Sequence, residues 1–118
     1  MAKFDLIGLG NALVDSEFHV TDSFLKKKGF EKGTMHLVDS DEQTNLLNSL
    51  EKEYGKPSLA CGGSATNTIF AASILGSSCS YMCKVGNDKN GNFYLDDLSD
   101  AGVNIDHSVM LDSNINSG

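Results

Sequence analysis

The residues of this chain that are best suited to chemistry lie in the segment Gly62-Gly63-Ser64-Ala65-Thr66-Asn67. The two glycines allow the backbone to come close to a ligand. We expect Ser64 to be the N-cap of the helix that follows, whose free N–H groups would point outward. Asn67 lies one turn into that helix, so its amide would face the same space. The segment predicts a site for one small polar ligand, although a glycine turn followed by a serine cap would also explain it without a ligand.

A second polar segment, Gly10-Asn11-Ala12-Leu13-Val14-Asp15, lies near the N-terminus. We expect Asn11 to close a turn and the residues after it to form a strand, on which Leu13 and Asp15 share one face. A carboxylate in that position can accept two hydroxyl hydrogens, such as those of a sugar diol. Considered alone, the segment is better explained by a turn asparagine and a surface aspartate.

The elements that must position these segments alternate between strands and helices. We expect strands over 4–8, 12–20, 34–38, 58–61, 79–85 and 103–111, and helices over 23–28, from Asp39 or Ser40 to Gly55, over 64–75 and over 90–101. The helix over 64–75 is apolar on most sides, which predicts burial on both of its faces. Alternation of this kind is typical of an α/β fold with a mainly parallel sheet, and the extra strands predict a small antiparallel layer beside it.

Composition excludes several classes of function. The 118 residues suit one small domain, and a net charge of −7 argues against a nucleic-acid partner. No apolar stretch is long enough for a membrane span, and the N-terminus lacks the apolar core of a signal peptide. The three cysteines, Cys61, Cys79 and Cys83, have no common zinc spacing. We therefore expect no metal site in this chain, reduced thiols and a cytoplasmic protein.

Taken together and in order, these motifs resemble the N-terminal part of the pfkB, or ribokinase-like, family of carbohydrate and nucleoside kinases. The diglycine segment is similar to the first signature of that family, and Gly76 and Gly86 follow at the signature's spacing; Ile69 departs from it, because a small residue is usual there. The further matches are Gly86-Asn87-Asp88 with Gly91, Gly10-Asn11 with Asp15, and Lys32-Gly33-Thr34-Met35 followed by Leu37-Val38-Asp39, the last two being similar to the adenosine kinase-like branch.

The resemblance implies the N-terminal, substrate-binding part of a ribokinase-like Rossmann-type sandwich over residues 1–118, with strands of a small β lid within about 12–38, 58–61 and 104–112. The C-terminal ATP-binding part would be absent. It also implies that the hydroxyls of a sugar or nucleoside, with adenosine favoured, are held by Asn11, Asp15, Gly62, Gly63 and Asn67, with Ser64 and Leu13 lining the pocket. The full-length protein would be a phosphotransferase that uses ATP and Mg²⁺, and a homodimer through the lid is possible in such a family.

Other groups that phosphoryl transfer needs do not occur in the sequence. The second signature of the family, a G-A-G-D segment that supplies the catalytic base and an anion hole, does not occur here, and neither does a G-x-x-x-x-G-K-[ST] loop. Asp100-Ala101-Gly102 has a similar composition in the wrong order. We therefore assign no catalytic residue and expect this chain alone to be inactive.

Two other functions remain open from the sequence. A dinucleotide-binding oxidoreductase is suggested by Gly8-Leu9-Gly10 after a strand, although Leu13 stands where a third small residue is needed and a strand is expected to follow. A non-catalytic sugar-binding module would use the same pocket without chemistry. The residues Asp88-Lys89-Asn90-Gly91-Asn92 resemble a calcium loop, but Phe93 and Ser99 stand where that loop needs glycine and glutamate.

Overall fold

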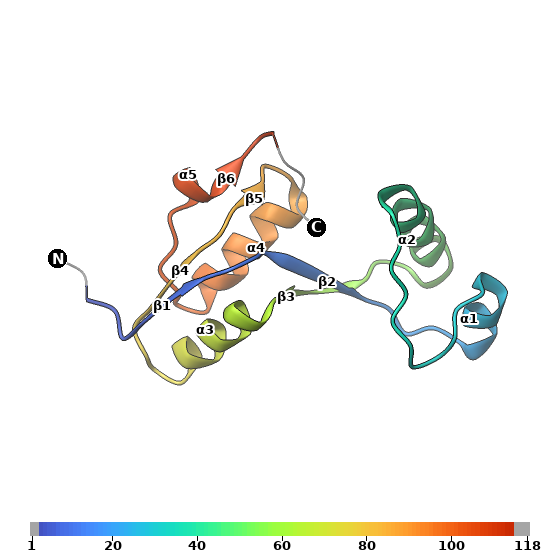
Figure 1. Cartoon of the computed structure of the whole chain (residues 1–118), viewed down its shortest axis with the longest axis horizontal. Coiled ribbons are helices and arrows are strands. Elements are labelled where there is room, and N and C mark those ends of the chain that lie inside the picture. Colours follow the sequence, from blue (N-terminus) through green and yellow to red (C-terminus); the bar gives the residue numbers. More distant parts are fainter. Residues whose placement is uncertain (1–2, 115–118) are drawn as a thin grey trace. The chain divides into compact units, whose positions relative to one another are not determined.

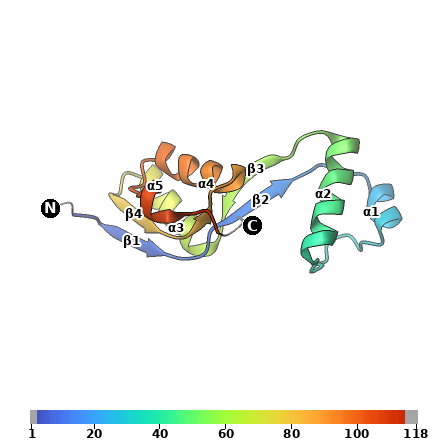
Figure 2. The ribbon, with the colours of Figure 1, turned by 90° about the horizontal axis from the view of Figure 1, so that it is seen from above.

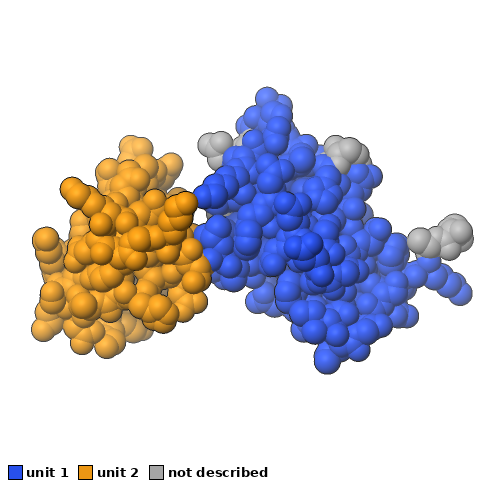
Figure 3. Space-filling model, turned by 180° about the vertical axis from the view of Figure 1, so that it is seen from behind, with its two compact units in different colours: residues 1–15, 59–118 blue, residues 16–58 orange. Residues whose placement is uncertain are grey.

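The computed structural model describes residues 3–114 and divides the chain into two compact units. Unit 1 consists of Met1–Asp15 and Leu59–Gly118, and unit 2 consists of Ser16–Ser58 (Figure 3). Both polar segments singled out in the sequence fall in unit 1, so the geometry of the candidate site can be described within that unit.

Unit 1 is built on parallel strand pairs. Strand β1 (Leu6–Leu9) runs parallel to β4 (Cys79–Met82), with Leu6 opposite Cys79, and the two lie side by side in both ribbon views (Figure 1 and Figure 2). Helix α3 (Ser64–Ile74) contacts both strands. A second parallel pair joins β5 (Val85–Gly86) to β6 (Leu111–Asp112), and a parallel bridge links Ser80 to Asn104. The α/β class and the mainly parallel pairing expected from the sequence are confirmed.

Helix α4 (Lys89–Asp100) supplies much of the core of unit 1. Its residues Tyr94, Leu95 and Leu98 are fully buried, whereas Asp96 and Asp100 are exposed, as its 3.6-residue pattern predicts. The helix begins at Lys89, one residue before the predicted range, because the side chain of Asp88 caps it by accepting a hydrogen bond from Gly91 N at 2.8 Å.

Two glycines allow β1 to lie directly against the core. A Cβ at Gly8 would lie 2.6 Å from Ile69 Cγ1 and 2.7 Å from Tyr81 Cδ2, and one at Gly10 would lie 2.7 Å from the Tyr81 hydroxyl. The Gly8-Leu9-Gly10 segment is therefore explained by close packing. The chain continues into strand β2 (Leu13–Glu17) and not into a helix, so the dinucleotide-binding interpretation is wrong.

Helix α3 is less buried than its composition predicts. Thr66 and Ile69 are buried, but Ile74 is 63% exposed and Leu75, at the C-cap, is 86% exposed. The prediction of burial on both faces is wrong for this chain, because β1 and β4 cover one face of the helix and leave the C-terminal apolar residues in contact with solvent.

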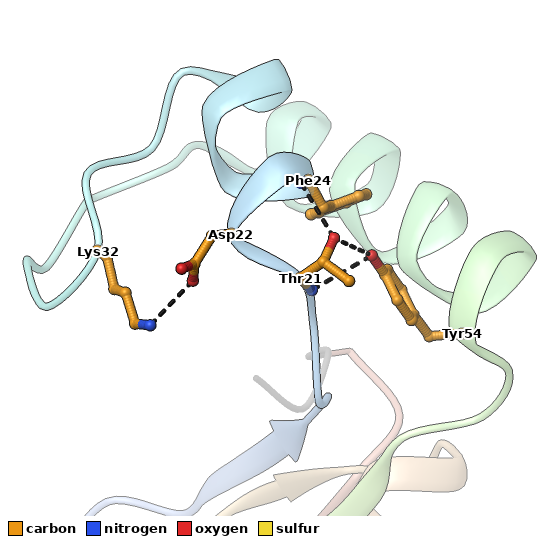
Figure 4. Close-up of polar contacts among 5 residues, drawn as sticks. All are labelled: Thr21, Asp22, Phe24, Lys32 and Tyr54. Atoms are coloured by element: carbon orange, nitrogen blue, oxygen red, sulfur yellow. Dashed lines mark hydrogen bonds and ion pairs between the residues drawn. The ribbon is translucent and has the colours of Figure 1, made fainter.

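Unit 2 contains two capped helices. The N-cap Thr21 begins α1 (Asp22–Lys28) and Gly29, at a φ of 77°, ends it; Asp39 begins α2 (Ser40–Tyr54) through a capping box with Glu42. The two helices are joined by the Thr21 and Tyr54 hydroxyls, 3.2 Å apart, and by an edge-to-face contact of Phe24 with Tyr54 (Figure 4). Of the two caps expected for the second helix, Asp39 and not Ser40 is the observed one, and both helices end where the sequence predicts.

Three predicted strands differ from the structure. Residues 34–38 form neither helix nor strand, and Thr34 instead bonds the Glu31 carbonyl and His36 Nε2, each at 2.8 Å. The segment 79–85 is split into β4 and β5. Residues His107–Met110 form the short helix α5, and β6 after them pairs with β5. A segment with strand propensity forms a strand only where it has a partner strand. The partner of β2 is β3 (Ser58–Gly62), and not the predicted strand over 34–38.

Within residues 3–114, no helix is both long and apolar enough to span a bilayer.

Truncation of one fully buried side chain of α4 should lower the stability of the protein strongly. Leu98→Ala should lower the free energy of unfolding by about 2–5 kcal/mol, because it removes a fully buried side chain and leaves a cavity. Leu75→Ala, at an 86% exposed position, is the control and should change it by less than about 0.5 kcal/mol. Equal effects in urea unfolding would contradict this description of the core.

Candidate functional site

The two polar segments meet where β2 lies beside β3. The carboxylate of Asp15 lies against Gly62: a Cβ at that glycine would be 2.8 Å from Asp15 Oδ2 and 3.1 Å from Oδ1. Because contacts below 3.0 Å do not occur for real Cβ atoms, any side chain at position 62 would displace the carboxylate. The sequence predicted that this glycine lets the backbone approach a ligand, and in the structure the group that lies against it is Asp15.

The second glycine of the pair lies against the N-terminal segment as well. Gly63 has a φ of 101°, which favours glycine, and a Cβ there would lie 3.0 Å from the backbone oxygen of Asn11. Gly63 is the N-cap of α3 and Asn67 N donates to its carbonyl at 2.9 Å. The prediction that Ser64 is the N-cap is therefore wrong: Ser64 is the first helical residue, and no side chain caps this helix.

The polar groups of the site face solvent. Asn11, Asp15, Ser64 and Asn67 are exposed, Gly63 is half-buried and Gly62 is buried. Leu13 is 49% exposed on the same face of β2 as Asp15, whereas Val14, on the other face, packs against the core. The structure thus brings Asn11, Asp15, Gly62 and Gly63 together, with Ser64 and Asn67 in the first turn of α3.

A hollow of about 660 Å³ opens beside Asn11, at the carboxyl ends of β1 and β4. It is lined by residues that include Leu9, Gly10, Asn11, Met82, Lys84 and Ile105. The carboxyl ends of parallel strands are where α/β proteins commonly bind ligands. Asp15, Gly62 and Asn67 do not line this hollow, so the contact between the two segments, and not one enclosed cavity, defines the site in this chain.

The residue before the diglycine carries a thiol that stays protonated at neutral pH. Burial is the main cause that raises the pKa of Cys61 to about 12, and the carboxylates of Asp97 and Asp15 add to it. The thiol donates a weak hydrogen bond to the Tyr94 carbonyl, with an S···O distance of 3.5 Å. Burial likewise raises the pKa of Cys83 to about 11. These thiols are poor nucleophiles, which argues for a packing role.

Sequence reasoning missed a group of buried hydroxyls behind the diglycine. Thr66 Oγ1 lies within hydrogen-bond distance of the Tyr81 hydroxyl, at 2.8 Å, and of the Tyr94 hydroxyl, and the Tyr94 hydroxyl donates to the Gly62 carbonyl at 3.2 Å. Burial raises the pKa of Tyr94, so this phenol stays neutral. The sequence contains only a weak signal for this group, a polar residue, Thr66, in a helix that is apolar on most sides.

Within the part of the chain that the structure describes, no three His, Cys, Asp or Glu side chains gather in a way that could hold a metal ion.

Comparisons with known proteins agree with one another. A family model described as pfkB family carbohydrate kinase matches residues 34–117. Adenosine kinase 2 of Arabidopsis thaliana is 30% identical over 103 residues, which cover 85% of this chain and 29% of that protein. The chain thus spans about three tenths of the length of this relative.

The solved structures that resemble this chain also include kinases. An adenosine kinase from Sinorhizobium meliloti is 37% identical, with a TM-score of 0.69 over 89% of this chain and 31% of that one. A probable sugar kinase from Rhizobium etli CFN 42 is 34% identical, with a TM-score of 0.67 over 87% of this chain and 30% of that one. An Anopheles gambiae adenosine kinase, solved with P1,P4-di(adenosine-5) tetraphosphate, is 25% identical, with a TM-score of 0.69 over 86% of this chain and 30% of that one.

The raised thiol pKa values predict a loss of stability at alkaline pH. Below pH 9.0, the ordinary value, both thiols are protonated in the folded and unfolded states, so their contribution to stability is fully present. Above it, the unfolded chain releases these protons first, and stability falls until the pH passes about 11 for Cys83 and about 12 for Cys61. Urea unfolding at a series of pH values measures this slope.

The double variant Cys61→Ala/Cys83→Ala is the control for that slope. It should show a shallower loss of stability between pH 9 and 11 than the wild-type chain, because two of the responsible protons are gone. An unchanged slope would mean that these thiols are not buried in solution as they are in the structure.

Proposed function

Since the chain belongs to the pfkB family of carbohydrate kinases, we propose that it is the substrate-binding portion of an ATP-dependent kinase that phosphorylates a hydroxymethyl group of a sugar or nucleoside. The observation that carries the proposal is the contact of the Asp15 carboxylate with Gly62, next to that of the Asn11 backbone with Gly63. Two segments more than forty residues apart in the sequence thereby offer an exposed carboxylate, amides and free backbone groups at one place.

Each residue of the site has a proposed task. Asp15 accepts hydrogen bonds from two neighbouring hydroxyls of the substrate, and the Asn11 and Asn67 amides donate to or accept from the remaining ones. Gly62 and Gly63 let Asp15 and the Asn11 backbone approach closely, and their own backbone would lie against the substrate. Ser64 lies in the first turn of α3, where free N–H groups favour a polar ligand. Leu13 gives an apolar wall on the face of β2 that Asp15 shares.

A nucleoside such as adenosine is the substrate that we favour. The support is that two of the similar proteins named above, at 30% and 37% identity, are adenosine kinases. The probable sugar kinase at 34% identity keeps a sugar among the candidates. Nucleosides and sugars both carry neighbouring hydroxyl groups, and these are the groups that Asp15 would bind.

Phosphoryl transfer itself is proposed to need residues outside this chain. ATP would supply the phosphoryl group and Mg²⁺ would neutralise its charge. The described residues offer no three-ligand group for a metal ion, so we derive no step through Mg²⁺ here and assign no catalytic residue. The role of this chain is to bind and orient the acceptor hydroxyl, and the chain alone is expected to be inactive.

The proposal also concerns the cellular compartment, the lid and the oligomeric state of the protein. A reducing, cytoplasmic environment is supported by the free thiols of Cys61, Cys79 and Cys83. A lid made from strands within 12–38, 58–61 and 104–112, and a homodimer through it, stay predictions.

The proposed reaction is tested on the natural protein with a panel of nucleosides and sugars. Phosphorylation of adenosine or a related nucleoside from ATP is the expected result, measured by the release of ADP and by the mass of the product. Activity on hexoses alone would overturn the preference for a nucleoside. Binding of a sugar with no phosphorylation of any member of the panel would favour a non-catalytic sugar-binding module.

The role of Asp15 is tested separately by substrate affinity. Asp15→Ala should weaken substrate binding by about 1–3 kcal/mol, because hydrogen bonds to a charged group are lost. Asp100→Ala, which removes an exposed carboxylate at the end of α4, is the matched control and should leave the dissociation constant unchanged. Equal affinity of Asp15→Ala and the wild-type protein in calorimetric titration would refute the contact with substrate.

Gly62→Ala provides a second test of the same carboxylate. Its methyl group would occupy the space of Asp15 Oδ2, so it should also weaken binding. Because both changes act through one side chain, the double variant should bind only slightly more weakly than Asp15→Ala. Fully additive losses would mean that Gly62 acts independently of Asp15.

A further inference from the structure

The buried hydroxyls of Thr66, Tyr81 and Tyr94 form one connected group behind the diglycine. All three residues are fully buried, and the described residues include no buried side-chain polar atom that lacks a partner. They come from three different elements: α3, β4 and α4. The group ends on the Gly62 carbonyl, which accepts from the Tyr94 hydroxyl at 3.2 Å.

Packing alone does not explain these hydroxyls. Valine and phenylalanine have similar shapes to threonine and tyrosine, and they would fill the same space without the cost of removing hydroxyls from water. Buried polar groups that are fully paired instead hold their partners in a unique arrangement. The partner that this group holds is the backbone at the end of β3, where the candidate site begins.

Gly62 lies between this group and the surface of the site. Its carbonyl is bonded by Tyr94 on the core side, while its Cα faces the Asp15 carboxylate on the solvent side. Tyr94 is linked a second time to the same strand, because its own carbonyl accepts from the Cys61 thiol at 3.5 Å. One residue of α4 thus holds two successive residues of β3.

We propose that Tyr94, supported by Thr66, is a positioning residue for the substrate site: its hydroxyl fixes the Gly62 peptide, and the Gly62 peptide fixes the place of the Asp15 carboxylate. Tyr94 itself does not touch the substrate. The inference rests on the proposed function, since it concerns the affinity of that same site.

The comparison of Tyr94→Phe with Tyr81→Phe tests it in the natural protein. Each variant loses one buried hydroxyl, but only Tyr94→Phe frees the Gly62 carbonyl; Tyr81→Phe leaves the bond between Tyr94 and Gly62 in place. For Tyr94→Phe we expect the dissociation constant of adenosine to rise about fivefold, which corresponds to one hydrogen bond. For Tyr81→Phe we expect less than a twofold change at a similar loss of thermal stability.

The dissociation constant of ATP is the second readout. It should stay unchanged in both variants, because the main ATP contacts are proposed to lie outside this chain. General destabilisation of the protein would instead weaken the binding of adenosine and of ATP together. If Tyr94→Phe does not fold, the variant Thr66→Val tests the proposal in its place, because it removes the hydroxyl that bonds Tyr94. The adenosine affinity of Thr66→Val should then be lower than that of Tyr81→Phe.

The outcomes separate the two levels of the proposal. A wild-type protein that binds neither adenosine nor any other member of the panel overturns both the proposed function and the role of Tyr94. A wild-type protein that binds adenosine, with equal affinities in Tyr94→Phe and Tyr81→Phe, overturns the role of Tyr94 alone.

Discussion

The contact between Asp15 and Gly62 is the constraint on which the candidate site depends. A carboxylate can rest there only because no side chain occupies position 62, where a Cβ would come within 2.8 Å of Oδ2. Strand β2 must therefore lie close beside β3, and the chain must turn sharply at Gly63 to begin α3. Every polar group that we assign to the site is positioned by this approach or by the helix that follows it.

The core of unit 1 serves the same contact from behind. Glycines at positions 8 and 10 allow β1 to approach Ile69 and Tyr81, so that the segment leading to Asn11 lies close to α3. Tyr81 and Tyr94 then connect the core, through Thr66, to the Gly62 carbonyl. The site is thus held by backbone and buried groups, and its exposed side chains remain free to bind a ligand.

Some features of the fold could be predicted because they are local. Helix α2 begins at Asp39, one of its two expected caps, and both helices of unit 2 end where expected, since capping involves neighbours within one turn. Strand predictions failed where a strand needs a distant partner: within 34–38 the Thr34 hydroxyl bonds the nearby Glu31 carbonyl and the His36 ring, and 107–110 form a helix. The end of α3 failed for a related reason, because apolar composition does not say how much of a face neighbouring elements will cover.

The candidate site, like the fold, could be predicted only in part. By itself the sequence singled out Asn11, Asp15 and the diglycine as candidates, and its motifs resembled a family that a family model matching residues 34–117 confirms. Only the tertiary structure decided that Asp15 rests on Gly62 and that Tyr94 bonds the Gly62 carbonyl. Contacts between residues thirty or more positions apart depend on how strands pair and helices pack, and no spacing along one chain encodes those distances.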